Sequence, residues 1–309
     1  MRPRNLLRLV CTIAAICVSL YKAQAEPIVY KHAIVGGVNL FYREAGDKNK
    51  PTILLLHGFP SSSSEFRDLI PVLAHQFHVL APDYPGMGNS EAPPASVLQP
   101  TFDNISLEIE GLVQQLGEKR LILYMHDFGG PVGMRIAQRH PGWIAGLVFQ
   151  NTSVSLDGYN PARLKVYQEI GGEETPEKLQ KAEQAATEER DIFLHTTGAH
   201  DSSALNPDNW TNDAYAFGIP EDRLFMSHLL MNIESNVSLY RQWNTYLKSN
   251  HPKTLVVWGK NDPVFTTAAA ESVKSAMPET IVHYYDAGHF ALDENSDDIG
   301  RRIVEVFAH

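Results

Sequence analysis

The sequence predicts an α/β fold, in which a mostly parallel central sheet is covered by helices and carries an inserted helical cap. Three observations lead to this fold class. Short apolar runs alternate with segments of helical spacing from residue 52 to 150, residues 154–249 are polar and helical without a clear strand, and strand signals return at residue 255. Alternating strands and helices favour a parallel sheet with both faces covered. We therefore expect a core of residues 26–153 and 250–309 with a cap of residues 154–249 between them.

The N-terminus has the three regions of a secretory signal peptide. Three arginines precede an uncharged apolar run from Leu9 to Leu20, and Ala23-Gln24-Ala25 offers a cleavage site before Glu26. An apolar run of this length is too short to span a bilayer, so we expect no stable membrane anchor. Residues 1–25 therefore predict export, to the periplasm or the exterior.

Composition and charge limit the classes of partner. The formal net charge of −10 disfavours nucleic acid and anionic membrane surfaces as partners. Both cysteines, Cys11 and Cys17, lie within the predicted signal peptide, so the mature chain has no disulfide or thiol chemistry. The histidines show no metal-ligand spacing, and His195 and His200 in the cap are expected to be solvated. We expect no metal and no cofactor.

The elements of the core follow from local pattern. Residues 28–45 alternate loosely around Gly36-Gly37 and predict a β-hairpin. Residues 52–56 form a β-branched and leucine run typical of a strand that is buried on both faces. Further strands are expected over 77–81, 121–126, 144–150, 255–258 and 280–285, and helices over 63–75, 104–116, the segment up to about Arg139, 267–277 and 300–307.

The stretch from Leu121 to Gly133 predicts a strand, a sharp turn and a helix. Its apolar run stops at His126-Asp127, small residues follow, and a helical pattern then begins. A turn of this kind delivers one side chain to the tip of a strained elbow, usually in the pattern G-x-S-x-G. Here Asp127 stands where serine is usual, and Met125 occupies the first small position.

The aspartate predicts a different reaction from that of a serine. Attack of a carboxylate on a carbonyl would give a mixed anhydride, a poor intermediate for ester hydrolysis. Attack on an sp³ carbon that bears a leaving group, such as an epoxide or halide carbon, gives an alkyl ester of Asp127. Water helped by a histidine base can then cleave that ester. The simpler alternative is that Asp127 is a polar residue at a strand end or the remnant of an inactive elbow.

Three further turns follow predicted strands, at the sheet edge where α/β proteins bind ligands. The first is His57-Gly58-Phe59-Pro60, whose backbone N–H, together with that of Phe128, could form an oxyanion hole. Asp262 follows the strand at 255–258, and His289 follows the last strand. The chain order of nucleophile, acid and histidine predicts a triad in which Asp262 orients His289. Taken singly, Asp262 and His289 could be an ordinary loop carboxylate and a surface histidine.

These motifs resemble the α/β-hydrolase superfamily over nearly all of the predicted mature chain. The segments His57-Gly58-Phe59-Pro60, His126 to Gly130, Asn261-Asp262-Pro263 and Gly288-His289-Phe290 are similar to those of soluble epoxide hydrolases and haloalkane dehalogenases. The resemblance implies the α/β-hydrolase fold, a cofactor-independent hydrolase and an Asp127–Asp262–His289 triad.

The resemblance also guides the choice between the two reactions. Haloalkane dehalogenases use tryptophan or asparagine side-chain donors for halide, where this chain has Phe59 and Phe128. Fluoroacetate dehalogenases carry arginines near the elbow, which Phe128 and Pro131 do not supply. Epoxide hydrolases use cap tyrosines to protonate the epoxide oxygen, and Tyr167 and Tyr240 are the candidates here, with His57 and Phe59 also placed at the substrate.

We therefore expect an epoxide hydrolase that acts on a small, apolar molecule. A haloalkane dehalogenase and a catalytically silent protein that binds a small ligand on the same fold remain the alternatives.

Overall fold

The computed structural model describes residues 27–308. The predicted signal peptide, residues 1–25, lies outside the described residues. Across the described part of the chain, no helix combines the length and apolar character needed to cross a membrane.

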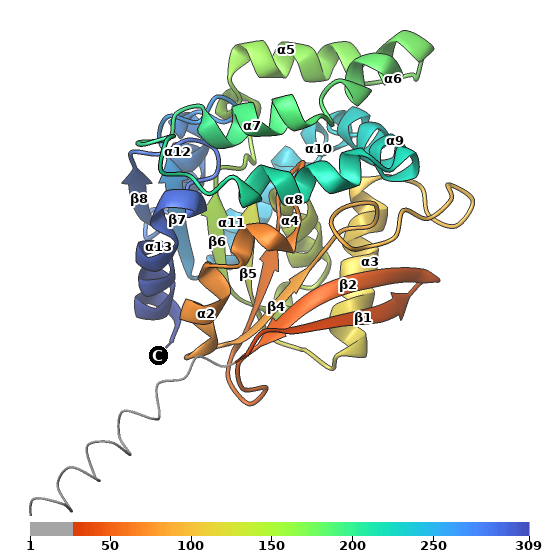
Figure 1. Ribbon diagram of the computed structural model, residues 1–309. Helices are drawn as coiled ribbons and strands as arrows, with labels where there is room; N and C mark the ends of the chain where they lie inside the picture. Colours follow the sequence, from red (N-terminus) through yellow and green to blue (C-terminus); the bar gives the residue numbers. More distant parts are fainter. Residues whose placement is uncertain (1–26, 309) are drawn as a thin grey trace, which may run out of the picture.

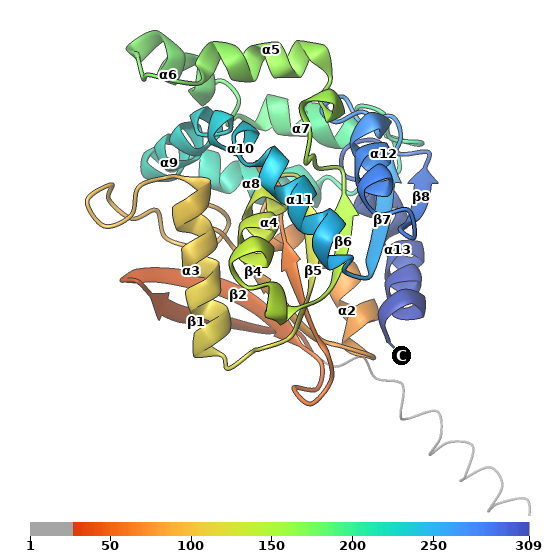
Figure 2. The same cartoon turned by 180° about the vertical axis from the view of Figure 1, so that it is seen from behind.

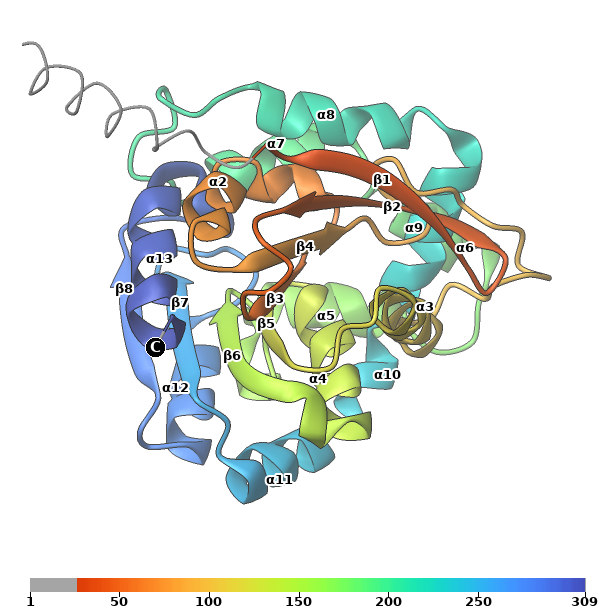
Figure 3. The same ribbon diagram turned by 90° about the horizontal axis from the view of Figure 1, so that it is seen from below.

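The core is a mixed sheet of eight strands in the order β1-β2-β4-β3-β5-β6-β7-β8. β2 runs antiparallel to β1 and β4, and the remaining neighbours pair in parallel. The sheet twists from β8 to β1, as the view from below shows (Figure 3). The strand bounds are β1 Val29–Val35, β2 Val38–Ala45, β3 Thr52–Leu56, β4 His78–Pro82, β5 Leu121–His126, β6 Ile144–Gln150, β7 Thr254–Gly259 and β8 Ile281–Tyr285.

Helices cover both faces of the sheet, which confirms the predicted fold class. α2 (Leu69–Ala74) and α13 (Leu292–Phe307) lie on the face seen in Figure 1. On the other face lie α3, α4, α11 and α12 (Figure 2), with bounds Phe102–Gln115, Gly129–Arg139, Tyr240–Asn250 and Thr267–Ala276. Successive residues of β3 alternate between the two apolar cores, with Leu54 and Leu56 in one and Ile53 and Leu55 in the other. This alternation explains the continuous apolar runs of the central strands.

A helical cap is inserted in the sequence between β6 and β7. Figure 1 shows α5 to α9 above the carboxyl ends of the strands. The cap bounds are α5 Pro161–Ile170, α6 Pro176–Glu183, α7 Glu188–Thr196, α8 Asp208–Phe217, α9 Pro220–Met231 and α10 Glu234–Val237. The predicted cap ends at residue 249, but α11 lies on the flank of the core beside α4 (Figure 2).

Two predicted helices differ from the structure. The helix expected over 63–75 is a 3₁₀ turn, Ser63–Phe66, followed by the short α2. Its start is set by Ser62, whose hydroxyl accepts from the Ser64 N–H, and by the Ser63 N–H, which donates to Asp83. The last helix begins at Leu292, earlier than the expected residue 300. The sequence did not indicate this start, because the first turns are polar and lack the apolar spacing that marks a helix.

Candidate active site

The turn after β5 holds Asp127 in a conformation that few L-residues adopt. Its φ is +44°, in the left-handed region that asparagine and aspartate visit more readily than most residues. The two following glycines allow the close approach of β3 and β6. A Cβ at Gly129 would lie 2.1 Å from the Leu56 carbonyl oxygen, and one at Gly130 would lie 2.0 Å from Thr152 Oγ1. The chain thus forms a sharp strand-to-helix turn with Asp127 at its tip.

Met125 occupies the position where the usual elbow has a small residue. The space for it comes from Gly133, one turn into α4, where a Cβ would lie 2.5 Å from Met125 Sδ. In this chain the small residue at this contact is therefore on the helix, at Gly133, and the larger residue, Met125, is on the strand.

Two backbone N–H groups contact the Asp127 carboxylate. The N–H of Phe59 donates to Oδ1 at 2.8 Å, and the N–H of Phe128 is close enough to the carboxylate to lower its pKa. Burial raises the pKa of Asp127, while His289, His126 and the two N–H groups oppose that rise. The same N–H groups can stabilise an oxyanion that forms at this carboxyl carbon.

His289 lies near the other oxygen of the Asp127 carboxylate. Asp262 holds its ring, and Asn151 in turn holds Asp262. Its Nε2 is 3.8 Å from Asp127 Oδ2, and its Nδ1 donates to Asp262 Oδ2 at 2.9 Å. Asn151, at the end of β6 with φ +40°, donates from Nδ2 to the same Asp262 oxygen at 2.8 Å. The Val264 N–H donates to the other oxygen of Asp262 at 2.6 Å. The Asp262 carboxylate is therefore held toward His289 by donors on both of its oxygens.

His126 supports the same histidine loop from beneath. Its Nδ1 lies 3.2 Å from each Glu65 carboxylate oxygen, and its Nε2 donates to the His289 carbonyl oxygen at 3.1 Å. Burial lowers the pKa of His126, but the negative charge of Glu65 outweighs this effect and the pKa is raised. Both ring nitrogens face acceptors, so the imidazolium form fits this position.

Comparison with known proteins identifies the family. The sequence matches the family described as alpha/beta hydrolase fold over residues 51–296. This chain belongs to that family. An uncharacterized hydrolase of Saccharomyces cerevisiae is 33% identical over 282 residues, which cover 90% of this chain and 97% of that protein.

Shorter matches link this α/β-hydrolase to the two enzyme classes that the sequence suggested. A haloalkane dehalogenase of Bradyrhizobium diazoefficiens is 32% identical over 122 residues, 40% of this chain and 38% of that one. A soluble epoxide hydrolase of Corynebacterium sp. is 36% identical over 110 residues, 36% of this chain and 37% of that one. The crystal structure of the haloalkane dehalogenase DbeA from Bradyrhizobium elkani has a TM-score of 0.77 at 21% identity and covers 91% of this chain and 98% of that one. This last likeness shows the fold.

A cavity of about 40 Å³ lies between the elbow and the cap of this hydrolase, bounded by Asp127 and His289. Of the four residues predicted to contact substrate, Phe59 and Tyr167 line it. Tyr240 does not line it, and its hydroxyl lies 2.7 Å from that of Tyr159, which is also absent from the lining. His57 is also absent from the lining, since its buried ring stacks on Tyr84 and its Nε2 accepts the Tyr84 N–H. Tyr240 and His57 thus support the site from outside the cavity.

Cap residues that the sequence did not single out complete the cavity. Arg163 of α5 and Arg190 of α7 line it, together with the cap residues Lys181, Val166, Ile170, Ala185, Leu194 and Leu230 and the core residue Val264. Burial raises the pKa of Tyr167, and the charge of Asp127 raises it further, so the Tyr167 hydroxyl is protonated at neutral pH. It is the one hydroxyl among the lining residues described.

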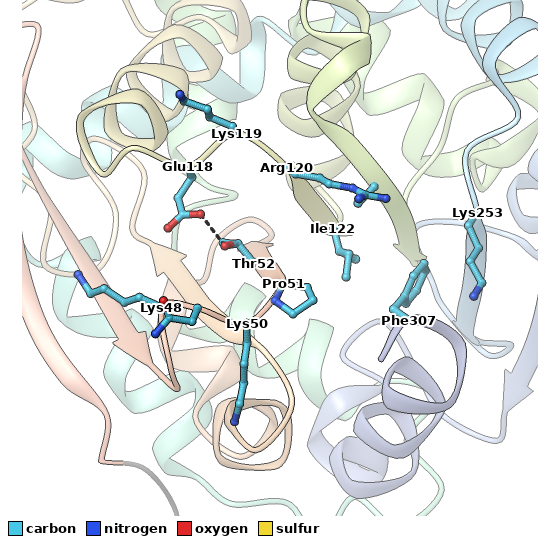
Figure 4. Close-up of a pocket in the computed structure, with 12 residues that line it drawn as sticks. Lys48, Lys50, Pro51, Thr52, Glu118, Lys119, Arg120, Ile122, Lys253 and Phe307 are labelled. Carbon is cyan, nitrogen blue, oxygen red and sulfur yellow. Dashed lines mark hydrogen bonds between the residues drawn. The ribbon is translucent and has the colours of Figure 1, made fainter. Parts of the chain in front are cut away.

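A larger cavity of about 530 Å³ lies at the opposite edge of the sheet (Figure 4). Its walls come from the amino ends of the strands, including Thr52, Arg120 and Lys253. Figure 4 shows Thr52 donating to Glu118 and the surrounding cationic side chains spread apart. Parallel sheets bind substrates at their carboxyl ends, and this cavity has none of the groups around Asp127. It is therefore separate from the candidate active site.

One buried cluster of ionisable groups departs from the sequence expectation. His195 is 3% exposed, although a solvated side chain was expected, whereas His200 is exposed as expected. His195 Nδ1 lies 2.6 Å from Asp293 Oδ2 of the core, and its ring stacks on Phe290. Within residues 27–308, Asp191, His195 and Asp213 form the one group with metal-ligand spacing. Because His195 joins α7 of the cap to α13 of the core, we interpret the cluster as a buried ionic link between them.

Proposed function

We propose that this α/β-hydrolase opens epoxides to diols through an alkyl ester of Asp127. The observation that carries the proposal is a carboxylate, where serine is usual, at the tip of the elbow and opposite His289. Partial-length relatives named as epoxide hydrolases support the same chemistry.

In the first step the Asp127 carboxylate attacks an epoxide carbon, a C–O bond forms to Asp127, and the ring C–O bond breaks. The departing oxygen would be an alkoxide, a strong base, so a proton must reach it as the bond breaks. The Tyr167 hydroxyl, which lines the cavity with Asp127, supplies that proton. Asp127 then carries a hydroxyalkyl ester, and Tyr167 is left as a phenolate.

In the second step His289 takes a proton from water, and the resulting hydroxide attacks the ester carbonyl carbon of Asp127. The N–H groups of Phe59 and Phe128 stabilise the tetrahedral oxyanion. Collapse breaks the bond between the carbonyl carbon and the diol oxygen, which takes the proton from the His289 imidazolium. The proton of the regenerated Asp127 carboxyl returns through solvent to the Tyr167 phenolate. The sum is epoxide plus water to diol.

The second candidate reaction is dehalogenation, in which halide leaves without needing a proton. Relatives and structural neighbours named as haloalkane dehalogenases favour it. The rings of Phe59 and Phe128, 5.1 Å apart at the nucleophile, offer no side-chain donor to a halide. We therefore place dehalogenation second, and a silent binding protein third, because binding alone needs no histidine opposite the carboxylate.

The test is to trap the ester. His289→Gln should still be alkylated but should hydrolyse the ester slowly, so the substrate mass should accumulate on the peptide that contains Asp127. The variant is mixed with panels of epoxides, haloalkanes and aryl esters and digested for mass spectrometry, with Asp127→Asn as the blank. An unmodified Asp127 peptide after exposure to a substrate that the parent enzyme turns over would contradict the mechanism.

We also propose that the protein is exported. The support is the charged, apolar and A-x-A pattern of residues 1–25. N-terminal sequencing of the protein from its native host should begin at Glu26, and an intact chain that starts at Met1 would contradict export.

A further inference from the structure

Two cationic side chains from the cap share the cavity with the nucleophile. Arg163 of α5 and Arg190 of α7 line the same cavity as Asp127, His289 and Tyr167. The guanidinium carbons of both arginines lie over the Phe193 ring, at 6.0 Å for Arg163 and 4.4 Å for Arg190. The two positive charges are therefore held near each other by one aromatic side chain.

Neither arginine has an anionic partner among residues 27–308. No carboxylate there forms an ion pair with either guanidinium, whereas Lys181, the third cation of the lining, pairs with Glu169. Burial and, to a smaller extent, the positive charge of Arg163 together lower the pKa of Arg190 to about 10. Two partly buried guanidinium groups that repel each other are costly unless an anion joins them. The arrangement therefore fits a ligand that brings a negative charge.

We propose that Arg163 and Arg190 bind a carboxylate of the substrate, and that the substrate is a short-chain epoxy acid. The proposal rests on the function proposed above and adds its substrate class. The Asp127 carboxylate would repel an anionic substrate, and the two arginines offset that repulsion. The planar guanidinium group matches a carboxylate with paired N–H donors. A cavity of only about 40 Å³ disfavours a long-chain substrate, and aliphatic side chains such as Val166 and Leu194 complete the wall.

The charge preference is measured with a matched pair of substrates, trans-2,3-epoxybutanoate and its primary amide. The two have the same carbon skeleton and epoxide and differ in charge. The parent enzyme should show a kcat/KM at least about tenfold higher for the acid, about 1.4 kcal/mol. In the double variant Arg163→Gln/Arg190→Gln this acid-to-amide ratio should fall at least about tenfold, mainly through a higher KM for the acid. Each single variant should give part of that loss.

The matched control is Lys165→Gln. Lys165 is an exposed residue on the same helix as Arg163 and is not part of the cavity lining. The Lys165→Gln variant loses one positive charge from α5, as Arg163→Gln does. Because Lys165 lies outside the cavity lining, this variant should keep the acid-to-amide ratio of the parent enzyme. An equal fall in the ratio for Lys165→Gln would assign the preference to the general charge of the cap and would overturn the proposal.

A binding measurement separates failure of this proposal from failure of the proposed reaction. Unreactive butanoate should raise the thermal midpoint of the parent enzyme and not that of the double arginine variant, whether or not any epoxide is opened. If epoxides are opened but acid and amide react equally in the parent enzyme, the arginine proposal is overturned and the reaction stands. If butanoate binding depends on the arginines but no epoxide reacts, the carboxylate site stands without the epoxide. If halide raises the thermal midpoint of the parent enzyme but not that of the double arginine variant, while butanoate raises neither, the carboxylate proposal is overturned and the arginines are assigned to a leaving group.

Discussion

Asn151 donates a hydrogen bond from Nδ2 to Asp262 Oδ2 at 2.8 Å, and this is the oxygen that also accepts from His289 at 2.9 Å. Asn151 is tied in turn to the end of β7, because its Oδ1 accepts the Gly259 N–H at 2.9 Å. The residue directly after β6 therefore fixes the orientation of the triad acid, which lies in the loop after β7. Asn151 is a positioning residue, and it acts on His289 through Asp262.

Asn151→Asp should slow hydrolysis of the alkyl ester at least about tenfold, or about 1.4 kcal/mol of barrier. Aspartate keeps the shape and tolerates the positive φ, but it removes the donor and faces Asp262 with a like charge. Alkylation of Asp127 should change less than hydrolysis, so the ester should accumulate during turnover, as intact-protein mass spectrometry can measure. Asn49→Asp, at an exposed loop position, is the control. Equal slowing of both steps would indicate a general loss of structure instead.

Tyr167→Phe should slow epoxide opening at least about tenfold, because the alkoxide then leaves without a proton donor. Tyr240→Phe should have the smaller effect, since the Tyr240 hydroxyl is hydrogen-bonded to Tyr159 and does not line the cavity. The measurement is the single-turnover rate of alkylation for each variant. A larger loss in Tyr240→Phe than in Tyr167→Phe would reverse the assignment of the donor.

The link between His195 and Asp293 predicts a fall in stability at high pH. Burial lowers the pKa of His195, but Asp293 and the facing carboxylates of Asp213 and Asp191 outweigh burial and raise this pKa to about 10. A histidine with a raised folded-state pKa stabilises the fold fully below its unfolded pKa of about 6.5. That contribution is lost as the pH rises through about 10, so the thermal midpoint should fall across this window.

Asp293→Asn tests the same link. Removing one partner of a buried ion pair should lower the free energy of unfolding by about 3–5 kcal/mol at neutral pH. The variant should also lose part of the pH dependence above pH 7. Asp297→Asn, at an exposed position of the same helix, should behave as the parent protein does. An Asp293→Asn variant with unchanged stability and pH dependence would show that the pair does not hold the cap.

Local pattern predicted the sheet well because each strand is a short apolar run that ends at a polar turn. The strand at 144–150 has the predicted bounds, and the structure brings Asp127, Asp262 and His289 together at the ends of three such runs. Chain order and strand-end position are properties of the sequence itself. The contribution of Asn151 was harder to predict, because a single asparagine after a strand has no distinctive spacing.

The cap was predicted as helical, but the faces of its helices were not. Arg163 and Arg190 lie on short charged helices, and such residues usually face solvent. Tyr167 and Tyr240 are equally plausible donors in the sequence, and only their packing distinguishes them. His195 was expected to be solvated because its partner, Asp293, lies on a helix of the core, far along the chain. Contacts between cap and core are set by tertiary packing, which local periodicity does not encode.

The central claim, that Asp127 forms an ester which water cleaves at the carbonyl carbon, can be tested with one labelling measurement. Excess parent enzyme is mixed with an epoxide substrate in H₂¹⁸O for a single turnover. The ¹⁸O content of the diol and of the Asp127 peptide is then measured by mass spectrometry. The account predicts that ¹⁸O enters the Asp127 carboxylate, while the new diol oxygen comes unlabelled from the enzyme. A labelled diol together with an unlabelled Asp127 peptide would mean that water attacks the epoxide directly, and would contradict the account.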